Sequence, residues 1–461
     1  MPIIVTPYIP TYITVHLGTP DSDAENLTIS FREYIKNVAS SEVYPTWHNS
    51  ALRANILAQV SFALNRVYTE FYPSQGYSFN ITASTAYDQK FIKGRNIFDS
   101  VSTLVDELFT VYIRRQGFVE PLAASFCNGT TTVCEFVEGP NALHGIVNAS
   151  AKAIEEAGIR AQVGYEVTER VPGEHILKKV SVANAEKGFE ENINFFKKYP
   201  KGNGGRIEGR LGLHTAFTNS RPTMEKARAI ANEYGVGIQI HIAEIPRAFV
   251  VEKHGMSAPQ ILEETGVLGP DVVAAHCIDL TDDDVAILAR NKVNIAHTPM
   301  TNSFGGNGVA RIPYMMEQGL NITLGHDCFF TLDIAEYLRY TFLLHKAYNA
   351  NAGLLPIFQV LDFALGNAAR ALGMEGQIGS LTVGKKADIL IINPDSPTPV
   401  APCSVLSYFD MTFQGRQVET VIVDGRIVVK DGHSTLVDEE QVMKDCQEQA
   451  KIMWRKTGVQ I

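Results

Sequence analysis

The sequence reads Gly235-Val-Gly-Ile-Gln-Ile-His241-Ile-Ala-Glu244, then Val272-Val-Ala-Ala-His276-Cys277, then Val293-Asn-Ile-Ala-His297-Thr-Pro299, and then Asn321-Ile-Thr-Leu-Gly-His326-Asp327. Each segment is a short apolar run, of the length of a β-strand, that ends in a histidine or an aspartate. Helix-like segments at residues 257–265 and 282–291 lie between the runs. Strands that alternate with helices predict a parallel sheet. Polar residues at the carboxyl ends of successive strands are where a (β/α)8 barrel carries its chemistry.

The length and composition of the chain narrow its class. A chain of 461 residues is too long for one ordinary core and predicts two or three domains. A net charge of −10 argues against a nucleic-acid partner, and the lack of an 18-residue apolar run argues against a membrane span. The N-terminus has no basic segment before an apolar core, and the six cysteines are widely scattered. We therefore expect a cytoplasmic protein with reduced thiols.

The first 130 residues lack the regular alternation seen later in the chain. Apolar spacing predicts helices over residues 30–39, 49–70 and 97–112, and strands over residues 12–17 and 77–82. This pattern is typical of an α+β segment.

Four motifs in this segment carry a family resemblance. They are Phe31-Arg-Glu-Tyr-Ile-Lys-Asn-Val-Ala-Ser-Ser-Glu42-Val-Tyr-Pro45, Ala51-Leu-Arg-Ala-Asn-Ile-Leu-Ala-Gln-Val-Ser-Phe-Ala-Leu-Asn65, Thr85-Ala-Tyr-Asp-Gln89 and Ser125-Phe-Cys-Asn-Gly129. Residues 12–129 thereby resemble the sporulation stage II protein D (SpoIID/LytB) family, which includes peptidoglycan lytic transglycosylases. The resemblance implies that Glu42 is the catalytic acid. A role for Glu42 in capping or solvating a helix end stays open, and the Trp-containing motif expected after Cys127 is absent.

From Gly129 onward the pattern changes to α/β and a second set of motifs appears. The set comprises Gly129-Thr-Thr-Thr-Val133, Gly212-Leu-His214-Thr-Ala-Phe-Thr218, His241-Ile-Ala-Glu244, His276-Cys277, His297-Thr-Pro-Met-Thr-Asn302, Asp327, Asn367-Ala-Ala-Arg-Ala-Leu-Gly373 and Ile378-Gly-Ser-Leu-Thr-Val-Gly-Lys-Lys-Ala-Asp388. Residues 129–430 thereby resemble the amidohydrolase superfamily, in the branch of deaminases and chlorohydrolases acting on triazines, cytosine, guanine and adenosine derivatives. The resemblance implies a TIM-like (β/α)8 barrel.

The chain departs from that family in one respect that affects both fold and site. The family's first barrel strand ends in a His-x-His pair of metal ligands, and this sequence contains no His-x-His. Residues 129–133 correspond to the second strand, so we expect an incomplete barrel that lacks its first strand, with two exposed sheet edges. The expected organisation is a truncated α+β segment (1–129), the barrel (130–385), a remnant of a small β-sandwich (386–435) and a C-terminal helix (436–461). Such a chain is a fusion, natural or artificial.

The amidohydrolase resemblance also implies a site. A divalent metal, zinc or iron, lowers the pKa of a water molecule in these enzymes. The expected metal ligands are His241, His276 and Asp327. The expected catalytic residues are Glu244, His276 and Asp327. The expected substrate-binding residues are His214, His297 and Asn302.

The expected function is metal-dependent hydrolysis of a C–N or C–Cl bond in a small heterocyclic molecule, by a deaminase or chlorohydrolase. Because a zinc site needs three protein ligands and a water, loss of the His-x-His pair predicts weak metal binding and slow hydrolysis. Two alternatives stay open, a peptidoglycan lytic transglycosylase acting through Glu42 and an inactive fusion. Bound metal favours the first hypothesis and metal-free cleavage of glycan strands favours the second. The sequence leaves open whether the chain forms a homo-oligomer.

Overall fold

The computed structural model describes residues 9–47, 49–68, 71–108, 127–139, 143–171, 180–202, 204–327, 332–395, 397 and 399–456. The chain divides into two compact units. One consists of Met1–Gln116 with Gly139–Ile146, and the other of Gly117–Glu138 with Val147–Ile461. Within the described part of the chain, every helix is too short or too polar to cross a bilayer.

The first unit contains a three-stranded sheet and three helices. The central strand β1 (Tyr12–His16) pairs antiparallel with β2 (Asn26–Ser30) and parallel with β3 (Ile81–Thr82). The helices are α1 (Phe31–Glu42), α2 (Asn49–Tyr68) and α3 (Asp99–Leu108). These elements agree with the helices and strands predicted from apolar spacing, and β2 is an addition. The predicted extension of the third helix to residue 112 lies outside the described residues.

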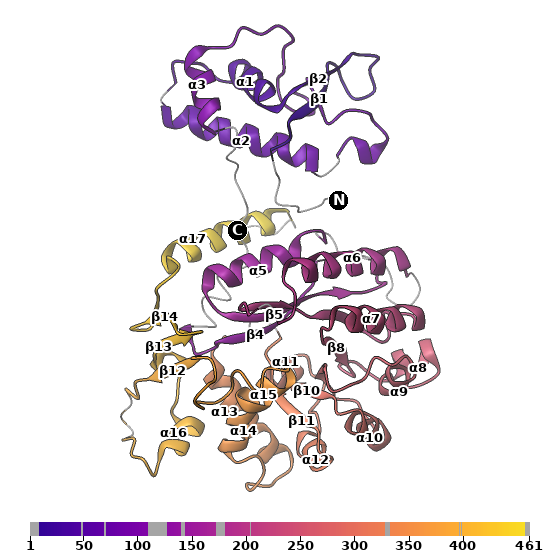
Figure 1. Ribbon diagram of the computed structural model, residues 1–461, viewed down its shortest axis with the longest axis vertical. Helices are drawn as coiled ribbons and strands as arrows, with labels where there is room; N and C mark the ends of the chain where they lie inside the picture. The colour runs from indigo at the N-terminus through magenta and orange to yellow at the C-terminus, as the bar shows by residue number, and fades with distance from the viewer. Residues whose placement is uncertain are drawn as a thin grey trace. The chain divides into compact units, whose positions relative to one another are not determined.

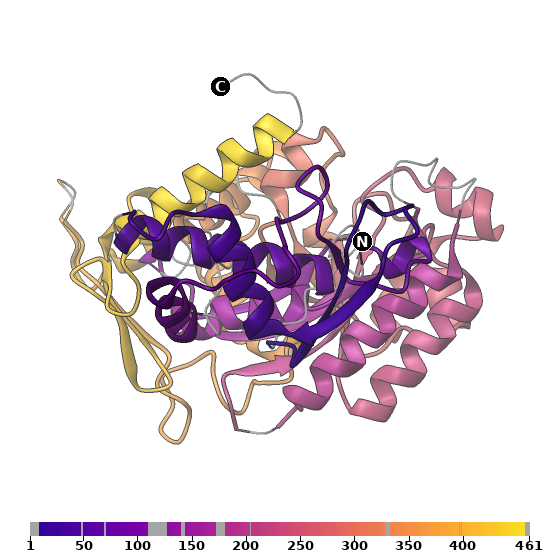
Figure 2. The same cartoon turned by 90° about the horizontal axis from the view of Figure 1, so that it is seen from above.

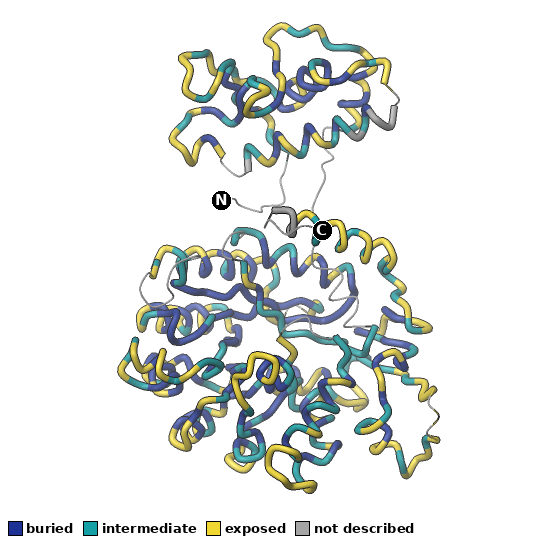
Figure 3. Tube along the Cα trace, turned by 180° about the vertical axis from the view of Figure 1, so that it is seen from behind, coloured by how far each residue is buried: buried dark blue, intermediate teal, exposed yellow. Residues whose placement is uncertain are grey.

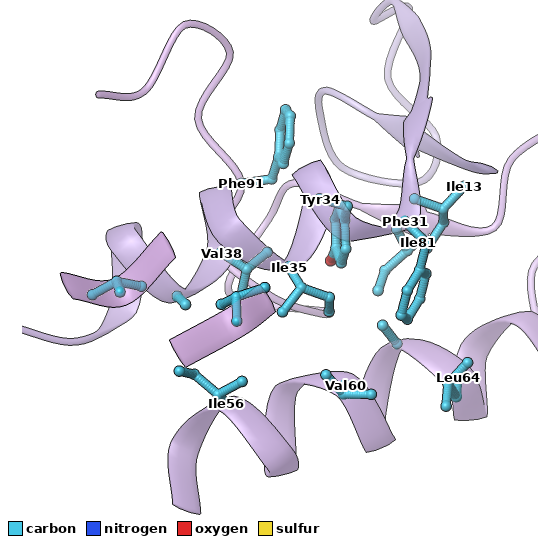
Figure 4. Close-up of a cluster of buried hydrophobic side chains, with 14 of the residues drawn as sticks. Ile13, Phe31, Tyr34, Ile35, Val38, Ile56, Val60, Leu64, Ile81 and Phe91 are labelled. Atoms are coloured by element: carbon cyan, nitrogen blue, oxygen red, sulfur yellow. The ribbon is translucent and has the colours of Figure 1, made fainter. Parts of the chain in front are cut away.

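This unit has a hydrophobic core of its own. Ile35 and Val38 of α1 point toward Ile56 and Val60 of α2, and all four side chains are fully buried (Figure 4). The spacing of three or four residues places each pair on one helix face. Ser30 begins α1, since its side chain accepts a hydrogen bond from the backbone N–H of Glu33 at 3.2 Å.

The second unit is built on a parallel sheet. Its strand order is β11-β10-β9-β8-β7-β5-β4, and β6 (Ile207–Gly209) pairs with β5 outside this path. The bounds are β4 (Thr132–Val137), β5 (Arg160–Val167), β7 (Leu211–Thr215), β8 (Ile238–Ile242), β9 (Val272–His276), β10 (Asn294–His297) and β11 (Asn321–Leu324). Seven strands thus follow the barrel order, and the described residues show no pairing of β4 with β11. The expected incomplete TIM-like α/β fold is therefore confirmed, and residues 12–60 supply no strand to it.

Helices connect the strands and cover the sheet. The bounds are α5 (Ile146–Ala157), α6 (Val182–Lys198), α7 (Arg221–Tyr234), α8 (Ala248–His254), α9 (Ala258–Glu264), α10 (Asp282–Arg290), α11 (Pro299–Phe304), α12 (Ile312–Glu317), α13 (Ile334–Tyr348), α14 (Ile357–Ala364), α15 (Gly366–Ala371) and α16 (Val405–Met411). In Figure 1, α5 and α6 lie along the same side of β4 and β5. Figure 3 shows that buried residues follow the strands, while exposed residues lie on the outer helix faces.

Two elements of this unit are interrupted in the structure. Residues 206–214 form two strands, β6 and β7, which both pair with β5. There the backbones approach closely, because a Cβ atom added at Gly164 would lie 1.9 Å from the carbonyl oxygen of Arg210. Helices α14 and α15 are separated at Leu365, whose ψ of −99° is not helical. Only glycine fits at residue 164, because the backbone of Arg210 lies so close. The spacing of apolar residues in the sequence gives no sign of this contact.

The C-terminal part of this unit forms an antiparallel sheet with the order β12-β13-β14-β15. Its strands are β12 (Ile389–Ile392), β13 (Val418–Val423), β14 (Arg426–Lys430) and β15 (His433–Ser434). A hairpin turn at residues 423–426 joins β13 to β14. The last element, α17 (Glu439–Lys456), is drawn in yellow as one uninterrupted helix (Figure 2). The division of the chain at residues 129, 385 and 435 stays a prediction.

Candidate metal centre

Titratable side chains gather at the carboxyl ends of the parallel strands. His214 lies on β7, His241 on β8 and His276 on β9, and Asp327 follows β11 by three residues. A further carboxylate, Glu166, lies near the end of β5. The carboxyl ends of parallel strands meet at one end of a barrel, so this arrangement is the one expected for its active end.

The first group of candidate ligands is Glu244, His276 and Asp327. Their ligand atoms all lie within 4.8 Å of one another. Nε2 of His276 is 3.8 Å from Oε2 of Glu244 and 3.7 Å from Oδ2 of Asp327. The His276 side chain is 1% exposed, whereas those of Glu244 and Asp327 are 33% and 29% exposed. The two carboxylates thus lie on the solvent side of a buried imidazole.

The ring of His276 is held in place by two side chains. Its Nδ1 atom lies 2.9 Å from Oδ1 of Asn302 and 2.9 Å from Oγ1 of Thr298. The Thr298 hydroxyl donates to Oδ1 of Asn302 at 3.1 Å, so both oxygens accept from the His276 Nδ1–H. With the amide of Asn302 in this orientation, Nε2 of a neutral His276 presents its lone pair to the two carboxylates.

The backbone at the end of β9 is strained. His276 has a φ of 71° and Cys277 a φ of 54°, a left-handed conformation that non-glycine residues seldom adopt. Such residues cost about 1–3 kcal/mol each and persist where the surrounding structure holds them. Residues in such conformations cluster at active sites, and here they lie beside the contact of His276 with Asn302.

The second group of candidate ligands is Glu166, His214 and His241, whose ligand atoms also lie within 4.8 Å of one another. Nδ1 of His241 is 3.0 Å from the carbonyl oxygen of His214 and 3.7 Å from Oε1 of Glu166. Phe136 of β4 stacks on the face of the His241 ring, with 4.5 Å between the ring centroids. A stacked phenyl ring covers the imidazole face and leaves the ring edge, which carries both nitrogens, accessible.

Burial decides the charge state of this second group. Burial, followed by the proximity of His241, lowers the pKa of His214 to about 3. Burial also lowers the pKa of His241, with His276 the next cause. In contrast, burial raises the pKa of Glu166 to about 8, and Glu138 is the second cause. The two imidazoles are therefore neutral at pH 7 and offer lone pairs.

The donor set fits a divalent cation. Three carboxyl groups and three imidazoles lie in the two groups together. The separations of 3.7–3.8 Å between nitrogen and oxygen are too long for hydrogen bonds. They are close to the spacing of two ligands that are each about 2.0–2.2 Å from one ion. Imidazole with carboxylate is the ligand chemistry of zinc and iron sites.

The structure brings together some of the predicted site residues and separates others. The expected ligand set of His241, His276 and Asp327 stays a prediction. His276 and Asp327 fall in one group, and the ring of His241, in the other group, lies 5.4 Å from that of His276 between centroids. His297 and Asn302, expected to bind substrate, are 0% and 1% exposed. Nε2 of His297 lies 3.0 Å from Nε2 of His345, a residue of α13. His297 is thus packed against His345, and Asn302 contacts His276, while their expected substrate-binding roles stay predictions.

Glu166 is the site residue that sequence reasoning missed. It lies in Gly164-Tyr-Glu166-Val167, at the carboxyl end of a strand whose every residue is buried. A charged residue in such a run is unusual unless it is paired. A glutamate next to the last residue of a strand was therefore the feature of the sequence that could have identified Glu166.

Glu42 lies in the first unit and has structural partners. Its Oε2 accepts a hydrogen bond from Nε2 of Gln59 at 2.9 Å, and its Oε1 accepts one from the backbone N–H of Lys90 at 2.7 Å. The carboxylate therefore ties the end of α1 to α2 and to the segment after residue 89. Neither contact is the helix cap or the solvated helix end that the sequence left open for Glu42.

An incomplete parallel barrel with imidazoles and carboxylates at its carboxyl end is typical of metal-dependent hydrolases of the TIM-like class. The model of the amidohydrolase family matches residues 94–428, which is more than half of the chain. The chain belongs to the amidohydrolase family and is, by family, a hydrolase acting on carbon–nitrogen bonds. The match begins well before Gly129, and the comparisons give no support to a stage II protein D segment.

Relatives with established names are similar over most of the chain. A 5'-deoxyadenosine deaminase from Methanosarcina acetivorans is 33% identical over 333 residues, which is 70% of this chain and 72% of the relative. A 5-methylthioadenosine/S-adenosylhomocysteine deaminase from Desulfitobacterium hafniense is 32% identical over 340 residues, covering 73% and 74%. Among solved structures, a zinc-bound adenosine deaminase from Xanthomonas campestris has a TM-score of 0.64 at 22% identity, covering 73% of each chain. The solved structure supports the fold.

Proposed function

We propose that this chain is a metal-dependent aminohydrolase that removes an amino group from an adenosine-type heterocycle. The observation that carries this proposal is the convergence of Glu244, His276 and Asp327 within 4.8 Å at the carboxyl end of the sheet. The substrate class rests on the relatives, which are named as deaminases of 5'-deoxyadenosine and of methylthioadenosine.

His276 and Asp327 are the residues that would hold the cation in this group. A divalent cation, zinc or iron, supplies a nucleophile at neutral pH by lowering the pKa of water. Asp327 is suited to accept a proton from that water, because its carboxylate is partly exposed and pairs with no arginine or lysine among the residues that the structure describes. Asn302 and Thr298 keep the His276 lone pair directed into the group.

Glu244 would carry the proton to the departing amino group. Its carboxylate lies 3.8 Å from Nε2 of His276 and is one-third exposed, so it borders both the cation group and solvent. Proton transfer by a positioned carboxylate contributes about 10²- to 10⁴-fold to a rate. A leaving amine needs such a proton, because an unprotonated amide ion is a poor leaving group.

The missing His-x-His pair bears on the rate of the reaction. The group of Glu244, His276 and Asp327 contains one imidazole, and loss of two further ligands weakens binding and positioning. We therefore expect turnover below about 1 per second, the low end for ordinary enzymes.

The test is a panel of substrates with added zinc or iron. It comprises 5'-deoxyadenosine, methylthioadenosine, adenosine, guanine, cytosine and a chlorotriazine, with ammonia and chloride release both measured. We expect ammonia release from an adenosine-type substrate that a chelator abolishes. Chloride release alone would point to a chlorohydrolase and overturn the proposed reaction. Metal-independent cleavage of glycan strands by the same protein would overturn it in favour of a lyase.

A further inference from the structure

We propose that a cavity at the amino ends of β9, β10 and β11 binds a small organic phosphate, a phosphomonoester on an apolar or aromatic body. The cavity encloses about 500 Å³, within the range of about 300–1,000 Å³ that is usual for small-molecule sites. Its walls come from the segments that enter these strands and from α12, α14 and α15. Both α14 and α15 pack beside β11 (Figure 1). The candidate metal centre lies at the carboxyl ends of the same strands, so the two sites are at opposite ends of the sheet.

The charge of the cavity lining is positive. Lys292 and Arg370 both line the cavity, and none of the described residues around it is acidic. The Lys292 side chain is exposed, and its ammonium group forms no ion pair or hydrogen bond with any residue that the structure describes. A phosphomonoester carries about 1.5–2 negative charges at neutral pH. Two cations in a lining without carboxylates therefore match the charge of one phosphate group.

The guanidinium of Arg370 is held in place by asparagine side chains. Its Nη1 donates to Oδ1 of Asn321 at 3.1 Å and to Oδ1 of Asn367 at 3.2 Å. Nδ2 of Asn321 donates in turn to Oδ1 of Asn294 at 2.8 Å and to the carbonyl oxygen of Asn367 at 3.0 Å. This chain of hydrogen bonds joins the first residues of β10 and β11 to α15. It orders the guanidinium before a ligand binds, which lowers the cost of binding.

The other edge of the Arg370 guanidinium is available to a ligand anion. Its Nε and Nη2 atoms lie 3.2 and 2.9 Å from Oε1 of Glu375. The side chains of Arg370 and Glu375 are 50% and 57% exposed, and ion pairs this exposed are weak. Arginine binds a phosphate through two parallel N–H···O hydrogen bonds. We therefore expect a phosphate group to displace Glu375 from this edge.

Part of the cavity lining is apolar. Leu320, Ile322 and Phe363 contribute to it and are 5%, 1% and 1% exposed. Core packing fixes these side chains, so the apolar surface is formed before a ligand binds. An inorganic phosphate would leave this surface uncovered, whereas an apolar body attached to the phosphate would remove it from water. The lining thus favours an organic phosphate over the free ion.

The experiment is a calorimetric titration of the full-length protein. Phenyl phosphate, inorganic phosphate and benzyl alcohol are the three ligands, and they separate the effect of the charge from that of the apolar body. A chelator in every titration prevents a metal ion from holding the anion. The variants are Lys292→Gln, Arg370→Gln and Glu375→Gln, and Lys197→Gln, at an exposed position of α6, is the matched control. Circular dichroism verifies that each variant is folded.

We expect phenyl phosphate to bind more tightly than inorganic phosphate, and benzyl alcohol not to bind. Lys292→Gln and Arg370→Gln should each weaken the binding of phenyl phosphate about tenfold or more, because each removes a hydrogen bond to a charged group. Glu375→Gln should tighten the binding, because it removes the carboxylate that competes for Arg370. Lys197→Gln should leave the affinity unchanged.

Three results would overturn the proposal. Absence of phenyl phosphate binding at millimolar concentration would remove the site. An affinity that neither Lys292→Gln nor Glu375→Gln changes would place the ligand elsewhere on the protein. Equal affinities for phenyl phosphate and inorganic phosphate would contradict the assigned class of ligand. The titration does not depend on ammonia release, so failure of the proposed function is seen separately.

Discussion

Nε2 of His276 lies 3.7 Å from Oδ2 of Asp327, although the two residues come from strands that are not neighbours. His276 ends β9 and Asp327 follows β11, with β10 between them. Alternate strands of a barrel direct side chains into the same layer, whereas the strand between them serves another layer. The intervening His297 accordingly lies in the core, with its ring against His345. His276 and Asp327 therefore lie in one group with Glu244, and His297 lies outside it.

Replacement of Glu244 by Gln tests its role in proton transfer. The amide keeps the shape of the side chain and cannot carry a proton, so we expect kcat to fall about 10²- to 10⁴-fold. KM should change little. The matched control is Glu252→Gln, an exposed position on α8. Equal kcat values for the Glu244 and Glu252 variants would remove Glu244 from the mechanism.

Replacement of Asn302 by Ala tests the support of His276. The change removes the oxygen that lies 2.9 Å from Nδ1 of His276 and leaves a buried donor with one partner, Thr298. Loss of such a contact typically weakens metal binding 10- to 100-fold, in order of magnitude. Zinc affinity measured by competition with a chelator gives the answer. Ser303→Ala, at an exposed position of α11, should leave the affinity unchanged.

A buried ion pair links the parallel sheet to the C-terminal sheet. Nε and Nη2 of Arg160 lie 3.0 and 3.1 Å from the two carboxylate oxygens of Asp388, and the two side chains are 2% and 5% exposed. Asp388→Ala leaves a buried guanidinium without its main partner, and we expect a loss of about 3–5 kcal/mol in unfolding free energy.

Urea unfolding measures this loss. The exposed pair of Arg370 and Glu375 is the control, because its side chains are 50% and 57% exposed. Glu375→Ala should cost less than about 1 kcal/mol. Equal shifts of the urea midpoint in Asp388→Ala and Glu375→Ala would contradict a stabilising role for the buried pair.

The pair of His297 and His345 predicts a pH dependence of stability. Burial lowers the pKa of His345 to about 4, against an ordinary value of 6.5. Between these pH values the unfolded chain binds a proton that the folded protein does not, so stability falls as the pH drops from 6.5 toward 4. The slope due to this residue is at most about 1.4 kcal/mol per pH unit.

Unfolding free energies at pH 7, 6 and 5 measure that slope. His345→Gln does not titrate, so its stability should fall less steeply than that of the unmodified protein. His433→Gln is the control, because its side chain is 79% exposed. Parallel curves for the unmodified protein and His345→Gln would contradict the assignment.

The sequence predicted the fold of the second unit well, for a physical reason. Strands that are buried on both faces appear as short apolar runs, and the end of each run fixes where the next side chain enters the barrel mouth. Residues 241, 276 and 327 were found in this way. The interruption at Leu365 and the close approach at Gly164 depend on contacts between distant segments, so no local pattern marks them.

The membership of the two cation groups could not be predicted. The period of the apolar residues and the spacing of the motifs show which residues lie at the carboxyl ends of the strands. They do not show how each imidazole ring is oriented. His276 is turned by positive φ angles, and His241 is placed by Phe136 and the carbonyl oxygen of His214. The resemblance to the family implies that His241 and Asp327 hold one ion, and this stays a prediction. Glu166 lies in none of the motifs that carry the resemblance.

The most direct test of the account is the release of ammonia from 5'-deoxyadenosine by the unmodified protein and by Asp327→Ala, each with saturating zinc or iron and with a chelator. We predict slow release, below about 1 per second, that needs the metal and disappears in Asp327→Ala. Release that is the same in Asp327→Ala, or that persists in the chelator, would contradict a catalytic cation at His276 and Asp327.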